Sequence, residues 1–89
     1  MKPREKIALM DKVLRELDDV INSQTSVLKK IAQIEADNIN LSDSDLSDAL
    51  PDIHEHVDAA LAATTEVQSK FKEVHDNFVR DNPIQEETT

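Results

Sequence analysis

Apolar residues recur every seven positions along both halves of this chain, and one short polar segment separates the halves. In the first half they form three neighbouring rows, namely Val13, Val20, Val27 and Ile34, then Met10, Leu17 and Ile31, then Leu14, Ile21 and Leu28. The pattern resumes at Ile53, Val57, Ala60, Thr64, Val67, Phe71, Val74 and Phe78. Steps of three and four residues place side chains on one side of an α-helix. The sequence therefore predicts two long amphipathic helices.

The composition favours an all-α protein. The chain has no glycine, and its only aromatic residues are Phe71 and Phe78, whereas a sheet protein normally carries turn glycines and more aromatic residues. Its 89 residues form one small domain, which is only marginally stable without an additional stabilising interaction. Because cysteine is absent, a disulfide cannot provide that interaction. Self-association is the remaining way to stabilise the domain.

The first helix has a clear beginning and an expected end. Pro3 suits the first turn of a helix, because the N–H that it lacks would have no partner there. We expect this helix to run to about Ala36. The polar stretch 22–26 does not disturb the seven-residue spacing, so we expect the helix to continue through it with a polar core layer at Gln24.

The expected reversal of the chain covers residues 37–41. Asn38 suits the left-handed conformation that ends helices, and Ser42 begins a sequence that resembles a capping box. Pro51 disfavours helical geometry at the residue before it and lacks a hydrogen-bond donor. We therefore expect the second helix to be broken or kinked near Pro51, with a short helical turn over 43–49 and a long helix over 51–81.

Two long helices joined by a short reversal form an antiparallel hairpin. The rise of the helices pairs residues whose numbers sum to about eighty. We assign residues 1–82 to a single helical-hairpin domain and residues 83–89 to a flexible acidic C-terminal tail. Three apolar rows make a stripe wider than one partner helix covers, and monomers seldom leave such a stripe exposed. We expect the row that comprises Val13, Val20, Val27 and Ile34 to be buried between two hairpins in a four-helix bundle, or else against the helices of a partner protein.

Charge is distributed unevenly along the chain. The formal net charge is −9, and residues 35–89 carry fourteen acidic against three basic residues. Such a surface repels nucleic acid and membranes and favours partners with a basic surface. The sequence has no secretory signal pattern and no apolar run near eighteen residues, so we expect a cytoplasmic protein that spans no membrane.

Acidic residues gather at the start of the second helix. Asp45, Asp48, Asp52 and Glu55 follow one another at steps of three, four and three, and Asp58 lies just beyond them. On a continuous helix these carboxylates form a line that imitates the phosphates of a nucleic acid and fits a basic groove. A solubilising face is the other interpretation, because runs of charge commonly just face water. The sequence leaves both open.

Two histidines in the second half of the chain, His54 and His56, lie among carboxylates and are candidate metal ligands. Asp52 with His56, and His54 with Asp58, lie one helical turn apart and are suitably spaced to share an ion. Protein metal sites usually need three or four converging ligands, and His75 lies several turns away. A solvated acidic face is the simpler interpretation. We expect no metal site and no cofactor.

Catalysis is not expected either, because the chain has no cysteine, no tyrosine and no glycine-rich phosphate loop. The preferred hypothesis is a small, non-enzymatic adaptor or regulator that dimerises as a helical bundle and binds a protein partner. The alternative is an acidic inhibitor, encoded by a phage or mobile element, that mimics nucleic acid and blocks the basic groove of a nucleic-acid-binding protein. Neither hypothesis includes direct contact with nucleic acid.

Overall fold

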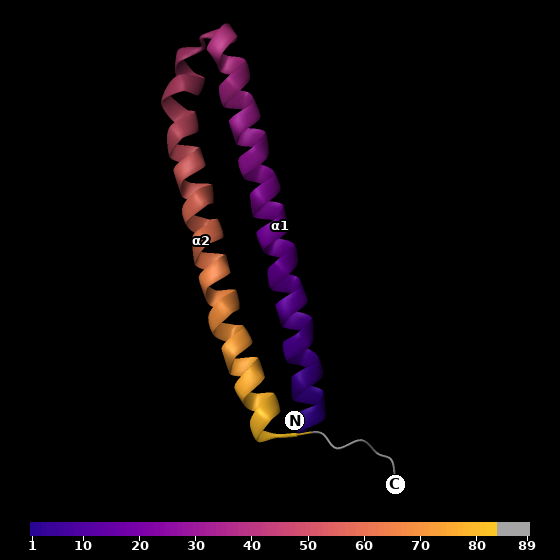
Figure 1. Cartoon of the computed structure of the whole chain (residues 1–89). Helices are drawn as coiled ribbons and strands as arrows, with labels where there is room; N and C mark the ends of the chain where they lie inside the picture. Colours follow the sequence, from indigo (N-terminus) through magenta and orange to yellow (C-terminus); the bar gives the residue numbers. More distant parts are fainter. Residues whose placement is uncertain (84–89) are drawn as a thin grey trace.

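The protein is a hairpin of two long α-helices. A computed structural model describes residues 1–83, in which α1 spans Pro3–Leu41 and α2 spans Ser44–Asp81. The helices lie side by side in antiparallel directions, with the turn at one end and the N-terminus at the other (Figure 1). The predicted all-α hairpin is thus confirmed. The predicted tail over 83–89 falls, from residue 84 onward, outside the described residues.

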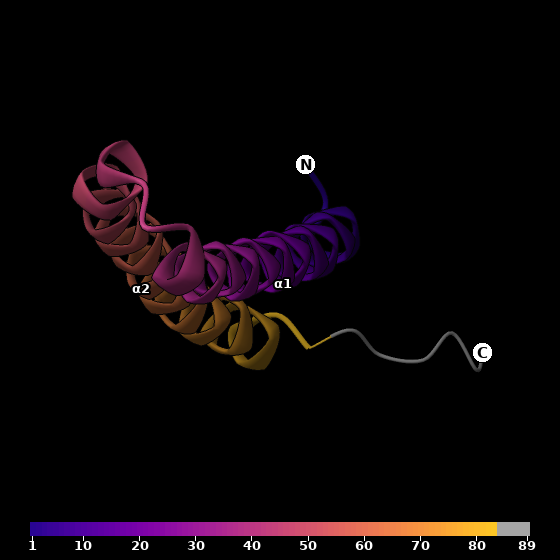
Figure 2. The ribbon, with the colours of Figure 1, turned by 90° about the horizontal axis from the view of Figure 1, so that it is seen from above.

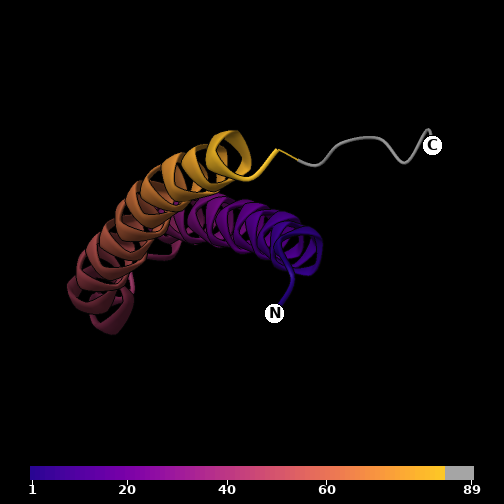
Figure 3. The same cartoon turned by 90° about the horizontal axis from the view of Figure 1, so that it is seen from below.

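The two helices meet along a seam with coiled-coil spacing. Seam positions alternate at steps of three and four, an average of 3.5 residues per turn that keeps one stripe of each helix facing its partner. From α1 they are Ile7, Met10, Leu14, Leu17, Ile21, Gln24, Leu28, Ile31, Glu35 and Asn38, and from α2 Leu50, His54, Val57, Leu61, Thr64, Gln68, Phe71, His75 and Phe78, all buried or half-buried. Viewed from the two ends, the helices cross rather than run strictly parallel (Figures 2 and 3).

The seam has a thin apolar core. Among residues 1–83 only Met10, Ile31 and Leu50 are buried apolar side chains, each 6% exposed. Polar side chains occupy several seam positions, including Gln24 in the middle of α1, where the helix is continuous as predicted. A core this small gives a domain little stability of its own.

The turn lies further along the chain than the sequence suggested. α1 continues past Ala36 to Leu41, and Ser42 rather than Asn38 takes the left-handed conformation, with φ of 58°. Asp43 caps α2, because its side chain accepts a hydrogen bond of 2.9 Å from the backbone N–H of Leu46. The expected end of the first helix at about Ala36 and the expected cap at Ser42 are therefore wrong, because α1 ends at Leu41 and Asp43 is the cap.

Buried Asn38 explains why the turn lies here. Its side-chain Nδ2 donates to the backbone oxygen of Asp43 at 3.2 Å and to the Ser47 hydroxyl at 2.8 Å. Its Oδ1 accepts from the backbone N–H of Asp43 at 2.9 Å. Asn38 is 9% exposed, so these bonds satisfy polar groups that burial would otherwise leave without partners. The asparagine thus ties the end of α1 to the start of α2.

The break expected at Pro51 is wrong, because α2 is one helix from Ser44 to Asp81 with Pro51 inside it. A proline in a helix interior removes a backbone hydrogen bond and costs about 3 kcal/mol. The segment before it is nevertheless held in place from both ends. Leu50 is buried in the seam, and the Asn38 network fixes the first turn of α2. Pro51 itself is exposed, so its ring disturbs no packing.

The register of the hairpin also differs from the expected one. Cross-helix polar contacts join His75 with Asp11, Gln68 with Asp18 and His54 with Glu35. The residue numbers in these pairs sum to 86, 86 and 89, not to about eighty. The shift follows from the later turn, since a reversal centred between Ser42 and Asp43 pairs residues around a sum of 85.

Candidate protein-binding faces

An apolar strip lies beside the seam and is not covered by either helix. We call it the apolar face. It comprises Val13, Val20, Val27 and Ile34 of α1 and Ile53, Ala60, Val67 and Val74 of α2. Each row repeats every seven residues, and its members precede a seam position by one residue on both helices. In an antiparallel pair, equivalent positions of the two helices lie on the same side of the seam. The two rows therefore form one continuous face.

Side chains of the apolar face remain substantially open to solvent. The exposed fractions of Val20, Val27 and Ile34 are 44%, 44% and 43%. Ile53 and Val67 on α2 are 45% and 50% exposed. Scattered exposed apolar residues are ordinary in proteins, but a contiguous row of them commonly marks an interaction site. The predicted row on α1 is thus left uncovered by its own chain, although Val13 is half-buried.

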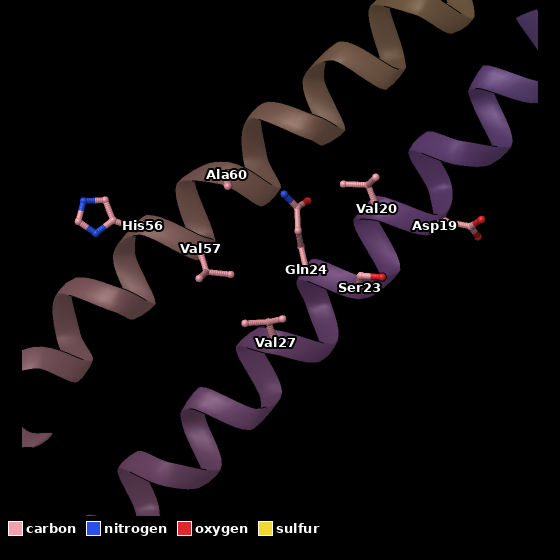
Figure 4. Close-up of a pocket in the computed structure, with 8 residues that line it drawn as sticks. All are labelled: Asp19, Val20, Ser23, Gln24, Val27, His56, Val57 and Ala60. Carbon is pink, nitrogen blue, oxygen red and sulfur yellow. The ribbon is translucent and has the colours of Figure 1, made fainter.

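A shallow groove of about 490 Å³ lies in the middle of the apolar face. Val20 and Val27 project into it from α1, and Val57 from α2, while the small side chain of Ala60 leaves room between them (Figure 4). Gln24 extends between the helices at its floor, and its buried Oε1 has no hydrogen-bond partner within the described residues. The groove is therefore apolar with one unsatisfied polar atom beneath it.

The sequence pattern of the second half does not by itself separate the α2 row of the apolar face from the seam. Ile53, Ala60, Val67 and Val74 alternate with seam residues in one stripe of apolar positions. The step of seven from Ile53 to Val74 was the available signal, and it indicates a second row. Only the contacts of α2 with α1 decide which of the two rows lies in the seam.

The predicted acidic row lies on a different side of the hairpin. Asp45, Asp48, Asp52, Glu55 and Asp58 are all exposed on α2. Because α2 continues through Pro51, their steps of three and four place them along one outward-facing side of the helix. We call this row the acidic face. A linear array of carboxylates requires a continuous helix, and α2 is continuous over these residues.

The histidines proposed as candidate ligands have other surroundings. The Nδ1 atom of His54 lies 3.2 Å from a carboxylate oxygen of Glu35 on α1. His56 is exposed and is one of the residues that line the groove (Figure 4). Within residues 1–83, no three side chains of the metal-binding types come close enough together to hold an ion. His54 contributes to the pairing of the two helices.

His75 occupies a seam position with a carboxylate on each side. Its Nδ1 atom lies 3.0 Å from Asp76 of α2, and its Nε2 atom lies 2.8 Å from Asp11 of α1. The hydrogen bond with Asp76 is the main cause that raises the pKa of His75 above its ordinary value of 6.5, and Asp11 raises it further, although burial opposes both. The same contact lowers the pKa of Asp76, and Lys72 adds to that effect. The protonated imidazole therefore links the helices electrostatically.

We expect stability to fall as pH rises through neutrality. A histidine whose pKa is higher in the folded state stabilises that state fully below pH 6.5, and this contribution is lost as pH rises through the raised pKa. Thermal unfolding followed by circular dichroism between pH 6 and pH 8 measures the loss. The variant His75→Gln is expected to show a flatter profile, whereas His56→Gln, at an exposed position, should retain the slope. An unchanged slope in His75→Gln would contradict the assignment.

Comparisons with known proteins give no relative. No family model matches the chain, and no curated protein or solved structure shows significant similarity to it. In the described part of the chain, neither helix is long and apolar enough to cross a membrane.

Proposed function

We propose that this protein is a non-enzymatic interaction module that dimerises through its apolar face into a four-helix bundle and acts as an adaptor or regulator for a protein partner. The observation that carries the proposal is the continuous apolar face, formed by both helices and covered by neither. A second hairpin placed on this face buries both rows in one core.

The size of the face supports a stable association. At about 1.5 Å per residue the 39 residues of α1 extend for about 58 Å, and the hairpin is 19 Å across. The whole side of the hairpin that carries the apolar face therefore presents about 1,000 Å², which is enough for the ~800 Å² that each partner contributes to a standard stable interface. Burial of the face also adds to a core that holds only three buried apolar side chains in the described hairpin.

The molar mass in solution tests the proposal directly. A chain of 10.0 kDa is expected to elute as a dimer, with about twice that mass, when light scattering follows size-exclusion chromatography at micromolar concentration. The sample should be helical by circular dichroism in the same buffer. A folded species of single-chain mass would overturn the proposal, because the apolar face would then be stable in water.

A second candidate function rests on the acidic face. Its five carboxylates lie on one outward side of a continuous helix, away from the apolar face, so both faces are usable in the same molecule. Turn-proximal residues 42–62 carry six acidic and no basic residues, which gives this end a strong negative field. These features support an inhibitor that occupies the basic groove of a nucleic-acid-binding protein in place of nucleic acid.

Charge reversal separates the two functions. The triple variant Asp45→Lys, Asp48→Lys, Asp52→Lys is expected to keep the dimeric mass, because these residues lie outside the apolar face. The test uses a duplex-DNA column to which DNA-binding proteins have been bound. If the acidic face mimics nucleic acid, the unmodified protein displaces these proteins from the column and the triple variant does not. The control variant Glu66→Lys, Glu73→Lys changes charge elsewhere on α2. Equal elution by all three proteins, or none by the unmodified one, would exclude mimicry.

A further inference from the structure

The two halves of the hairpin differ in charge. The turn half, residues 23–62, carries eight acidic and two basic residues, a net charge of −6. The terminal half comprises residues 1–22 and 63–83 and carries nine acidic and eight basic residues, a net charge of −1. Packed helices lie 8–10 Å apart, within the distance over which charges interact at physiological salt. The relative direction of two packed hairpins therefore has a large electrostatic consequence.

The apolar face also changes in bulk along its length. Towards the turn its side chains are Ile34 and Ile53. Towards the termini they are Val13, Val20, Val67 and Val74. Filling the space between two faces evenly requires large side chains opposite small ones. Two faces with their turns together would place the large residues against each other at one end and valines against valines at the other.

We propose that the two hairpins pack with their turns at opposite ends, with the two-fold axis crossing the groove between Val20 and Val27. This arrangement rests on the proposed dimer and specifies how its second copy is oriented. Each turn half then lies on the half of its partner that carries eight basic residues. Ile34 then faces Val13 of the second copy, and Ile53 faces Val74. The opposite direction would place two halves of net charge −6 side by side.

The groove fits the position of the axis. It lies near the midpoint of α1, which spans residues 3–41, and it is lined by Val20 and Val27 on either side of Ser23. A rotation of 180° about this point places Val20 of one copy against Val27 of the other, and Val13 against Ile34. Ala60 leaves the space into which these valines pack. The unpaired oxygen of Gln24 lies next to the axis, at the layer where the two copies meet.

Distances between spin labels test this arrangement, and the absence of native cysteine makes labelling specific. Two single variants are prepared as full chains. Asn40→Cys places a label at the turn, and Ser23→Cys places one beside the axis, both at exposed positions. With turns at opposite ends, the helical rise gives a separation of about 50 Å between the two turn labels and at most about 20 Å between the two central labels. Double electron–electron resonance spectroscopy measures both distances.

The outcomes separate this inference from the proposed function. A long turn-to-turn distance together with a short central distance supports the arrangement. A turn-to-turn distance of about 20 Å in a dimeric sample would overturn the opposed packing and leave the dimer standing. A dimer with long distances at both positions would place the contact away from the groove and would also overturn it. The absence of any measurable coupling, with single-chain mass by light scattering, would remove both the arrangement and the dimer.

Discussion

The double variant Val20→Asp, Val27→Asp is expected to convert the dimer into monomers. Both valines lie at the centre of the apolar face, and a dimer buries four of these side chains in all. Burial of one valine stabilises by about 1.5–3 kcal/mol, and an unpaired carboxylate in the same place adds a desolvation cost. We expect the dissociation constant to rise by at least about a hundredfold. Sedimentation equilibrium over a range of concentrations measures it.

Ile39→Asp is the matched control for this experiment. Ile39 is a β-branched apolar residue that is 77% exposed and lies outside the apolar face. The same change of chemistry there should leave the dissociation constant within about threefold of the unmodified value. If the double variant remained dimeric, or if Ile39→Asp dissociated the dimer equally well, the association could not be assigned to the apolar face.

Asn38→Ala is expected to give the largest loss of stability of any single change in the turn. The substitution removes three hydrogen bonds that join the end of α1 to Asp43 and Ser47, and it leaves the N–H of Asp43 without its acceptor. Losses of this kind cost about 1–3 kcal/mol for each buried group left unsatisfied. We expect the free energy of unfolding to fall by about 2–3 kcal/mol. Urea unfolding at fixed protein concentration measures it, because dimerisation contributes to apparent stability.

Asn40→Ala provides the comparison within the same helical turn. Asn40 is exposed, so its loss should change the free energy of unfolding by less than about 0.5 kcal/mol. Equal stability of the Asn38 and Asn40 variants would mean that the buried asparagine does not hold the turn. A large loss in both would mean that the effect of Asn38→Ala cannot be assigned to its hydrogen bonds, because alanine favours a helix more than asparagine does and helix propensity alone predicts no loss.

The sequence determined that this protein is a helical hairpin, because its periodicity is local. A step of three or four residues sets which side chains share a helix face, whatever the helix packs against. The rows through Val13 and Leu14 therefore predicted that α1 continues through residues 22–26, and the row through Met10 predicted its polar layer at Gln24, without reference to α2. The uncovered row on α1 followed from the same pattern, since three rows cover more of a helix than one partner shelters.

Only the tertiary structure decided where the turn lies and how the helices align. Local sequence preferences predicted a helix end at Asn38 and a break at Pro51. Such preferences do not include long-range contacts, here the buried hydrogen bonds of Asn38 and the burial of Leu50. Once those long-range contacts fixed the register, Ile53 and Val67 lay on the same side as Val20 and Val27. Periodicity assigns faces to each helix separately, but the contacts between helices decide which faces combine into one surface.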